Sequence, residues 1–242
     1  MSLKVQRNAL RSLLDERSPA DAMAAYYAYY HDADRTNLIT QPRNPGAEGA
    51  KGYIAISRTG IDLFRPFLTM RLPIKDYEIS MRLLRQALPP KAEAFIGCPI
   101  HYGPLLGSFC DFISEQQLAL YSISKRNYEP VVNVLVSRED QNGSARFVIK
   151  KAINGKRTAV AAAGLNWESP NFAEVAVRTW SEYRRQGLGK SVVSAIVNHI
   201  LATGRTPIYA VNVNNVASIA LAEQLGFRDT GYRQLMLEVV AR

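Results

Sequence analysis

The apolar positions of the first 128 residues follow helical spacing in some stretches and strand spacing in others. Leucines and alanines recur at helical intervals up to Leu14, and Ser18-Pro19 then ends one helix and begins another. The later elements predicted by the pattern are strands at 53–57 and 63–72, a helix at 77–88, a short strand at 94–98 and a helix around 105–112. This order is typical of mixed α/β packing.

Four tyrosines cluster in the second predicted helix, at Tyr26, Tyr27, Tyr29 and Tyr30. Such a cluster is either a binding surface or core and interface packing. Packing is the commoner role of aromatic rings, which bury a large apolar area.

The pattern changes beyond residue 128, where short β-branched segments follow one another. Asn-Gly pairs at 142–143 and 154–155 predict hairpin turns. The elements predicted around and after them are strands at 131–136, 145–150, 158–165 and 172–179, a helix at 188–201, a strand at 207–213 and a short helix from Asn215. We therefore divide the chain into a mixed α/β domain at 1–128 and a second domain, rich in antiparallel strands, at 129–242.

Composition and charge exclude little. The net charge of the 242 residues is +9, with 16 basic and 12 acidic residues in 1–128 and 14 and 9 in 129–242. This even excess suits a polyphosphate ligand or solubility alone, and without a Lys/Arg cluster it disfavours nucleic-acid binding. There is no apolar run of about 18 residues, so no membrane span is expected. The first 17 residues lack the apolar centre of a secretory signal, which predicts a cytoplasmic protein.

The two cysteines and three histidines do not suggest a metal site. Cys98 and Cys110 are too few for a disulfide framework, and the histidines are scattered without ligand spacing. We expect both thiols to be buried and reduced, and no metal to be bound.

The segment of 129–242 that carries chemistry is the turn at 184–191, of sequence RRQGLGKS. Gly187 and Gly189 let the backbone turn tightly and approach a ligand without a Cβ in the way. Because a helix follows at once, its free N–H groups and the positive end of its dipole predict an anion site. The spacing is neither that of a Walker loop nor that of a dinucleotide-binding turn.

Two motifs resemble the GNAT superfamily of acetyl-coenzyme-A-dependent N-acetyltransferases. The first is Arg184-x-x-Gly187-x-Gly189, which is similar to the pyrophosphate-binding turn of that family. The second begins at Asn215 and continues through Ser218 and Leu221 to Gly226-Phe227, with the family's spacing. The resemblance covers roughly 129–242 and implies a GNAT fold, a mixed and mostly antiparallel sheet flanked by helices in the α/β (α+β) class.

The resemblance also implies acetyl-CoA as the acetyl donor. The main chain of Val177 and Thr179 is expected to pair with the pantetheine arm, as in β-augmentation. The backbone of the turn is expected to hold the pyrophosphate, and two residues of the second motif to lie beside the arm. The predicted cofactor residues are Val177, Thr179, Arg184, Arg185, Gln186, Gly187, Leu188, Gly189, Lys190, Asn215 and Ser218.

The family reaction, direct acetyl transfer to an amine, needs a base, an oxyanion donor and an acid for the thiolate. A backbone N–H near Val177 is the oxyanion candidate. Glu174, which interrupts an apolar strand, is the first candidate for the base, although an edge-strand glutamate facing solvent has the same pattern. The weaker candidates for the base are Glu168 and Glu182.

The position after Leu221, where many family members have the tyrosine that protonates the thiolate, is Ala222. One option is that Tyr209 or Tyr232 serves as the acid, although a packing role explains each of them equally simply. A second option is that the thiolate leaves unprotonated and takes its proton from water. The third option is a module that binds coenzyme A or an acyl-CoA as a sensor without efficient catalysis.

The leading hypothesis is an N-acetyltransferase that acts on a small-molecule or peptide amine, and family members often form homodimers. The N-terminal half has the element order of the later part of a GNAT domain, but no glycine turn between Leu72 and Tyr77. It is therefore either a degenerate GNAT-like half or an extension that walls the acceptor site.

Overall fold

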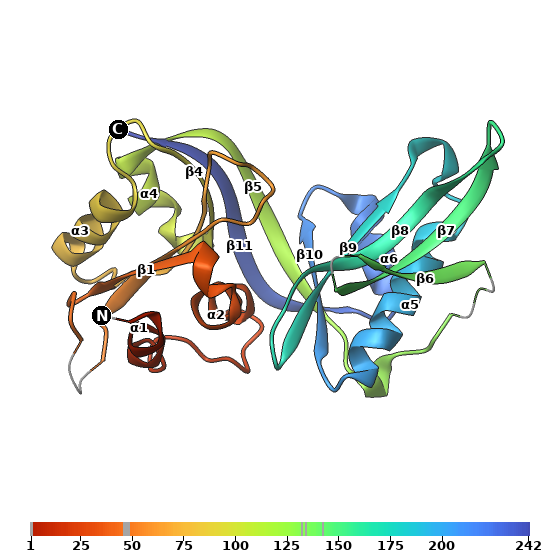
Figure 1. Cartoon of the computed structure of the whole chain (residues 1–242), viewed down its shortest axis with the longest axis horizontal. Helices are drawn as coiled ribbons and strands as arrows, with labels where there is room; N and C mark the ends of the chain where they lie inside the picture. Colours follow the sequence, from red (N-terminus) through yellow and green to blue (C-terminus); the bar gives the residue numbers. More distant parts are fainter. Residues whose placement is uncertain (1, 46–48, 132, 134, 142) are drawn as a thin grey trace. The chain divides into compact units, whose positions relative to one another are not determined.

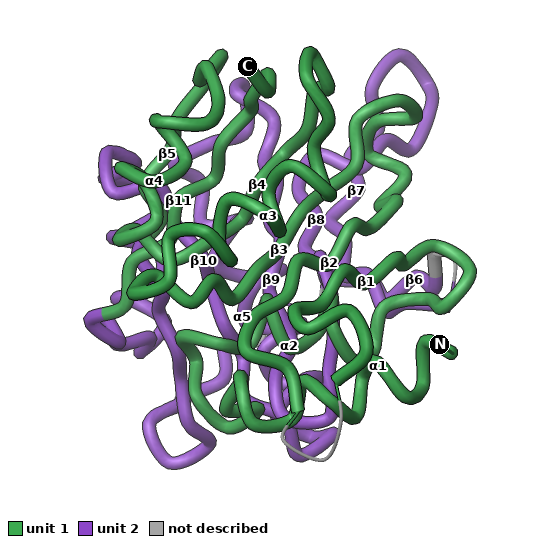
Figure 2. The backbone as a smooth tube through the Cα atoms, turned by 90° about the vertical axis from the view of Figure 1, so that its left-hand side faces the viewer, with its two compact units in different colours: residues 1–118, 232–242 green, residues 119–231 purple. Residues whose placement is uncertain are grey.

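The computed structural model describes residues 2–45, 49–131, 133, 135–141 and 143–242 (Figure 1). Contacts divide the chain into two compact units, one of residues 1–118 with 232–242 and the other of 119–231 (Figure 2). The predicted division at 128 and 129 differs from this one because two long strands each run from one unit into the other. These strands are β5 (Cys110–Ser122) and β11 (Arg228–Ala241).

The first unit is a sheet with helices before and between its strands. Its elements are α1 (Leu3–Ala9), α2 (Ala22–Ala25) continued by a π-helix (Tyr26–Tyr30), β1 (Thr36–Gln41), β2 (Gly52–Ser57), β3 (Phe67–Arg71), α3 (Tyr77–Ala87), β4 (Glu93–Pro99) and α4 (Gly103–Phe109). The strand order is β1-β2-β3-β4-β11-β5. Strands β3 and β4 are parallel, whereas the β1–β2, β2–β3 and β4–β11 pairs are antiparallel.

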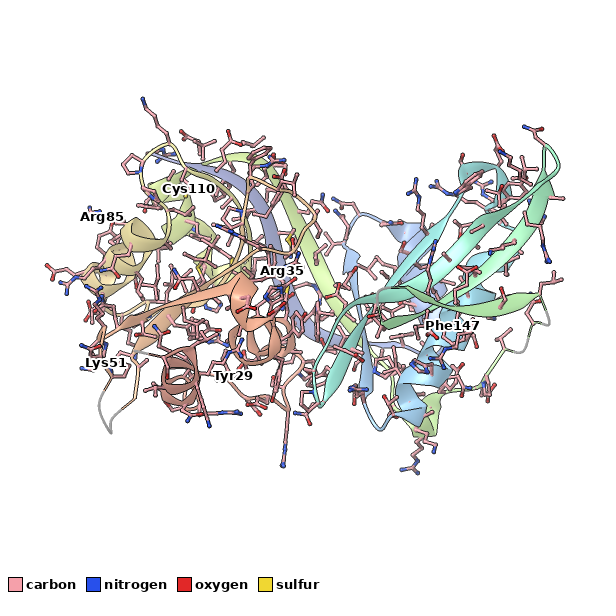
Figure 3. All side chains as sticks on the ribbon, in the orientation of Figure 1. Tyr29, Arg35, Lys51, Arg85, Cys110 and Phe147 are labelled. Atoms are coloured by element: carbon pink, nitrogen blue, oxygen red, sulfur yellow. The ribbon has the colours of Figure 1, made fainter. Side chains whose placement is uncertain are left out.

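Two apolar clusters form the core of this unit. One includes residues of α3, α4 and β11, and the other joins α1 and α2 to β1 and β2. The predicted packing role of the tyrosine cluster holds for Tyr27 and Tyr29, which are buried. The hydroxyl of Tyr29 donates to the Leu10 carbonyl at 2.8 Å (Figure 3).

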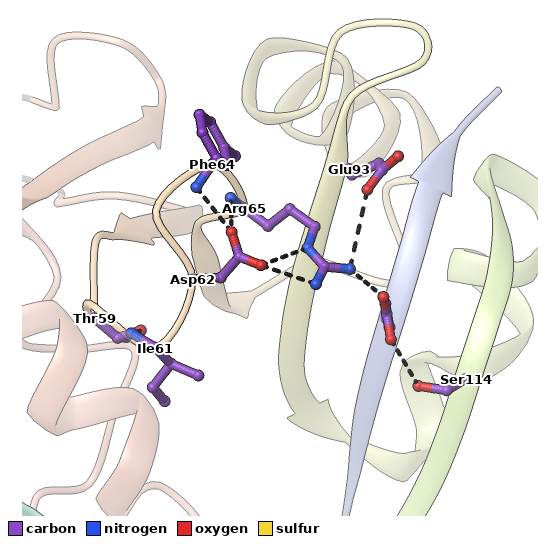
Figure 4. Close-up of polar contacts among 8 residues, drawn as sticks. Thr59, Ile61, Asp62, Phe64, Arg65, Glu93 and Ser114 are labelled. Carbon is purple, nitrogen blue, oxygen red and sulfur yellow. Dashed lines mark hydrogen bonds and ion pairs between the residues drawn. The ribbon is translucent and has the colours of Figure 1, made fainter.

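The predicted strand at 63–72 is wrong in its first half, because β3 begins only at Phe67. Asp62 forms a local turn instead, accepting from the backbone N–H groups of Phe64 and Arg65 at 2.8 and 2.9 Å. The Arg65 side chain pairs with Asp62 and with Glu238 (Figure 4). These hydrogen bonds replace strand pairing, and they lower the pKa of Asp62 to about 2.

The second unit begins with consecutive antiparallel strands. Its elements are β6 (Val136–Gln141), β7 (Ser144–Ile153), β8 (Lys156–Glu168), β9 (Phe172–Thr179), α5 (Leu188–Ala202), β10 (Thr206–Asn212) and α6 (Val216–Gln224). The strand order is β10-β9-β8-β7-β6, with only β9 and β10 parallel. Helix α5 packs on one face of this sheet, where Phe147 of β7 lies 5.9 Å from the ring of His199 (Figure 3).

The predicted strand at 131–136 is also wrong, since β6 begins where that run ends. Gln141 pairs with Ser144, so the partners of β7 are the more polar residues 136–141. Residues 132 and 134 of this predicted strand, and residue 142 of the first predicted hairpin, lie outside the described residues. The second predicted hairpin is confirmed: Asn154 and Gly155 have φ of 50° and 76° between the paired Ile153 and Lys156.

Candidate active site

Strands β9 and β10 separate partway along their length. They pair only over Phe172–Glu174 and Thr206–Ile208, although β9 continues to Thr179 and β10 to Asn212. The N–H of Trp180 donates to Val160 at 3.0 Å on the β8 side. Because backbone groups alternate in direction along a strand, those of Val177 and Thr179 point the other way, into the gap.

The turn that follows β9 presents free backbone donors. Arg185 and Gly187 have φ of 60° and 73°, the left-handed conformation that glycine adopts without strain. The first α5 bond runs from the Ser191 N–H to the Gly187 carbonyl, and no side chain caps the helix. Among the described residues, none accepts from the backbone N–H groups of residues 188–190, so these groups are available to an anion.

Gly189 packs closely against β9. A Cβ there would lie 3.2 Å from Thr179 Oγ1, so a larger residue would require the Thr179 side chain to shift by a few tenths of an ångström. The turn and the strand edge are thereby held together.

A cavity of about 680 Å³ joins this turn to α6. It is lined by Val177, Arg178, Thr179, Tyr183, Arg184, Arg185, Gly187, Leu188, Gly189, Lys190, Asn215, Ala217, Ser218, Ala220, Leu221 and Gln224. The structure thus brings together ten of the eleven residues predicted for the cofactor. The exception is Gln186, whose side chain contacts Lys151 and the Glu182 carbonyl.

The lining residues not predicted for the cofactor are Arg178, Tyr183, Ala217, Ala220, Leu221 and Gln224. Those on α6 follow helical spacing with Ser218, which is a signal that could have identified them from the sequence. Three cations, Arg184, Arg185 and Lys190, lie at the end of the cavity where α5 begins. The positive charge and the helix dipole act in the same place.

Asn215 begins α6, and its side chain accepts from the Ser218 N–H at 3.1 Å. The Ser218 side chain is hydrogen-bonded to Tyr209, a buried residue of β10. Burial raises the pKa of Tyr209, and the hydrogen bond to Ser218 opposes that rise. Ala222, at the position where the family often has tyrosine, is fully buried in the core of this unit.

Glu174 lies where the gap between β9 and β10 begins. Its carboxylate accepts from Asn166 Nδ2 at 2.7 Å and from Trp167 Nε1 at 2.5 Å. Two consecutive side chains reach one carboxylate because the β8–β9 register shifts between Leu165 and Trp167. Burial raises the pKa of Glu174 against the effect of these two donors.

The other candidate acids and bases lie elsewhere. Glu168 is 3.6 Å from Arg205, and Glu182 lies in the short 3-10 helix Ser181–Tyr183 before the turn. Tyr232, 46% exposed, belongs to the first unit. None of these three, and neither Glu174 nor Tyr209, is among the described residues that line the cavity.

The corresponding place in the first unit is closed. Strands β3 and β4 pair as β9 and β10 do, over Phe67–Thr69 and Phe95–Gly97. Beyond this pairing, Tyr102 Oη accepts from the Leu72 N–H at 3.0 Å and donates to its carbonyl at 3.2 Å. Asp76 caps α3 by accepting from the Ile79 N–H at 3.0 Å, so both the strand edge and the helix N-terminus are occupied.

Both cysteines are free and buried, and burial raises their pKa values, that of Cys98 to about 12 and that of Cys110 to about 11. In the part of the chain that the structure describes, no group of three or more His, Cys, Asp or Glu side chains is arranged to hold a metal ion. Nor does any described helix have the length and apolarity to cross a membrane.

Comparison with known proteins gives one matching family model and several similar folds. Residues 156–235 match the model described as FR47-like protein. No curated protein matches the chain.

Among solved structures, a putative GNAT-family acetyltransferase from Novosphingobium aromaticivorans is 19% identical at a TM-score of 0.59, over 78% of this chain and 88% of the other. A GCN5-related N-acetyltransferase from Sphaerobacter thermophilus is 8% identical at 0.61, over 100% and 94%. A tandem GNAT protein from the clavulanic acid biosynthesis pathway is 11% identical at 0.59, over 99% and 94%.

Proposed function

The chain has the fold of the GNAT superfamily in a tandem-like arrangement, and from this premise we propose that its second unit is an acetyl-CoA-dependent N-acetyltransferase. The observation that carries the proposal is the open gap between β9 and β10, which leads directly to a turn with unpaired backbone donors. The gap supplies donors and acceptors for an extended amide-containing arm, and the turn supplies donors for a pyrophosphate. No other part of the described chain combines the two.

Acetyl-CoA supplies an acyl group activated as a thioester. The turn binds the pyrophosphate through the N–H groups of Leu188, Gly189 and Lys190, and Val177 and Thr179 orient the arm. A backbone N–H near Val177 stabilises the negative charge that develops on the acyl oxygen. Held by these contacts, the thioester would lie in the gap, which begins at Glu174.

Glu174 takes a proton from the acceptor's ammonium, which frees the nitrogen lone pair to attack the thioester carbonyl. Its carboxylate is oriented by Asn166 and Trp167, both neutral donors, so its charge is not cancelled by a cation. The raised pKa brings this carboxyl closer to neutral pH, where a general base works best. Ser218 passes its proton to the departing thiolate and takes one from the hydroxyl of Tyr209, to which it is hydrogen-bonded, and the Tyr209 phenolate regains a proton from solvent. This relay replaces the tyrosine that is absent at Ala222.

The alternative function is a coenzyme-A-binding module without efficient turnover, favoured by the alanine at position 222. The two functions share the cavity and differ only in whether an amine is acetylated.

The first test compares two tryptophan variants by calorimetric titration with acetyl-CoA. Gly187 and Gly204 lie at opposite ends of α5 with φ of 73° and 80°, and a Cβ at either meets nothing within 4 Å. Gly187→Trp and Gly204→Trp therefore carry similar backbone strain, but only the first places a ring in the cavity. We expect micromolar binding by the wild type and by Gly204→Trp, and none by a folded Gly187→Trp.

Equal binding by both variants would place acetyl-CoA elsewhere and contradict the proposed site. Circular dichroism verifies the fold of each variant. An assay of thiol release with a panel of amines then separates the transferase, which turns over, from the binding module.

A further inference from the structure

A second cavity, of about 430 Å³, lies on the face of the second unit's sheet opposite α5. Its floor consists of small residues on neighbouring strands, Ala162 and Gly164 of β8 and Ala176 of β9. They point away from α5 because their neighbours along the strands, such as Ala163 and Val175, belong to the core beneath that helix.

This cavity meets the proposed cofactor cavity at β9. Val177 and Arg178 line both, so the two cavities are reached from opposite faces of the same strand. The second cavity thus lies against the strand that also lines the cavity proposed for acetyl-CoA. By strand alternation, Glu174, at the start of the gap, is on the same face of the sheet as the second cavity. This shared strand makes the second cavity the candidate place for the acceptor.

Charge is unevenly distributed along this face. Glu174, Ala176 and Arg178 are every second residue of β9, so their side chains lie on the same face of the sheet as the second cavity. Glu174 lies near the start of the gap, and Arg178 lies on the other side of Ala176. The two charged residues are four positions apart along the strand, which corresponds to about 13 Å between their Cα atoms. Arg178 has no carboxylate partner among the described residues, whereas Arg146, on the same rim, lies 3.9 Å from Glu139.

We propose that the acceptor is a primary amine that carries a carboxylate several carbon atoms away, with its amine directed to Glu174 and its carboxylate to Arg178. The small residues between them leave room for an extended methylene chain or a short peptide. A guanidinium binds a carboxylate with two parallel hydrogen bonds, which gives both affinity and orientation. An α-amino acid, with its two groups one carbon apart, is too short to reach both ends.

This inference rests on the proposed transferase function, and it is tested with amines that differ in one group. The probes are 6-aminohexanoate, hexylamine and glycine, each assayed with acetyl-CoA at the same pH. We expect kcat/KM for 6-aminohexanoate to exceed that for hexylamine by about tenfold or more, since an ion pair of this kind contributes on that scale. Glycine should be the poorest of the three.

Arg178→Gln should raise KM for 6-aminohexanoate by about tenfold and remove most of the advantage of 6-aminohexanoate over hexylamine. Arg157→Gln is the matched control, because it removes the same charge from an exposed position near the β7–β8 hairpin and should change none of these values. Equal kcat/KM for 6-aminohexanoate and hexylamine would overturn the acceptor class while leaving the transferase intact. Weakened acetyl-CoA binding in Arg178→Gln would instead assign this arginine to the cofactor. Acetyl-CoA binding without acetylation of any amine would contradict the transferase function itself.

Discussion

At the scale of single residues, similar groups have different roles according to their surroundings. Glu174 and Glu168 lie six residues apart, yet one is held by two neutral donors beside the gap and the other is 3.6 Å from Arg205. The pKa of Glu174 is raised because burial disfavours its charged form more than the two donors favour it. A carboxyl in this state costs stability, and perturbed pKa values cluster at functional sites, so we take its role to be proton transfer.

Glu174→Gln tests this use. The unfolded carboxyl has the lower pKa, so between the two values the folded state binds more protons and loses stability as the pH rises. The variant removes the buried charge, but its amide has one oxygen for the two donors Asn166 and Trp167. These effects oppose each other, so Tm at pH 7 should change little, while kcat/KM falls by about 10²–10⁴-fold. In the wild type, kcat/KM should rise with pH through the raised pKa, and this rise should disappear in the variant.

If kcat/KM of Glu174→Gln still rises with pH over the same range, another group is the base. If the variant's free energy of unfolding falls by as much as its activation free energy rises, the role of Glu174 is structural only. Glu168→Gln serves as the comparison, because it removes a carboxylate of the same unit that is paired with Arg205 and does not lie beside the gap.

At the scale of elements, α6 shows how a short helix is positioned to bind a ligand. Its nine residues begin at a side-chain cap, and five of the residues that line the cavity lie on the helix. A helix this short is marginal by itself, so its cap and its packing determine whether it forms.

Asn215→Ala removes the cap that accepts from the Ser218 N–H, and it should lower the free energy of unfolding by about 1 kcal/mol. Both tryptophans, Trp167 and Trp180, belong to the second unit, so their fluorescence during urea unfolding reports on that unit. Asn214→Ala is the control, since its side chain makes no hydrogen bond among the described residues. Equal destabilisation by the two variants would contradict the capping role.

At the scale of the whole molecule, the two units repeat one arrangement with different outcomes. Each has a parallel strand pair that ends early and a helix that begins beyond it. In the second unit the strand edge and the helix N-terminus are open, whereas in the first Tyr102 bonds the strand edge and Asp76 caps the helix. We therefore expect only one of the units to bind acetyl-CoA.

The calorimetric stoichiometry should thus be one acetyl-CoA per chain, and it should fall to zero in Gly187→Trp. Two equivalents in the wild type, or one remaining in the variant, would show that the first unit has a site despite Tyr102. Chain concentration is measured independently by absorbance, because the result depends on the ratio alone.

The sequence by itself determined the features that depend on neighbours along the chain. Short-range geometry, which is visible in the spacing of the motifs, determines four features: the glycine turn, the helix that follows it, the cap at Asn215 and the hairpin at Asn154-Gly155. The fold of the second unit followed from the same motifs.

Only the tertiary structure decided what depends on pairing between distant segments. The register of β6, the bulge that brings Asn166 and Trp167 to Glu174, and the pairing of β11 with β4 each involve strands that several alternative registers would satisfy locally. The face of the sheet on which Arg178 lies depends on the register of strand pairing, because a shift of one residue turns every side chain to the opposite face.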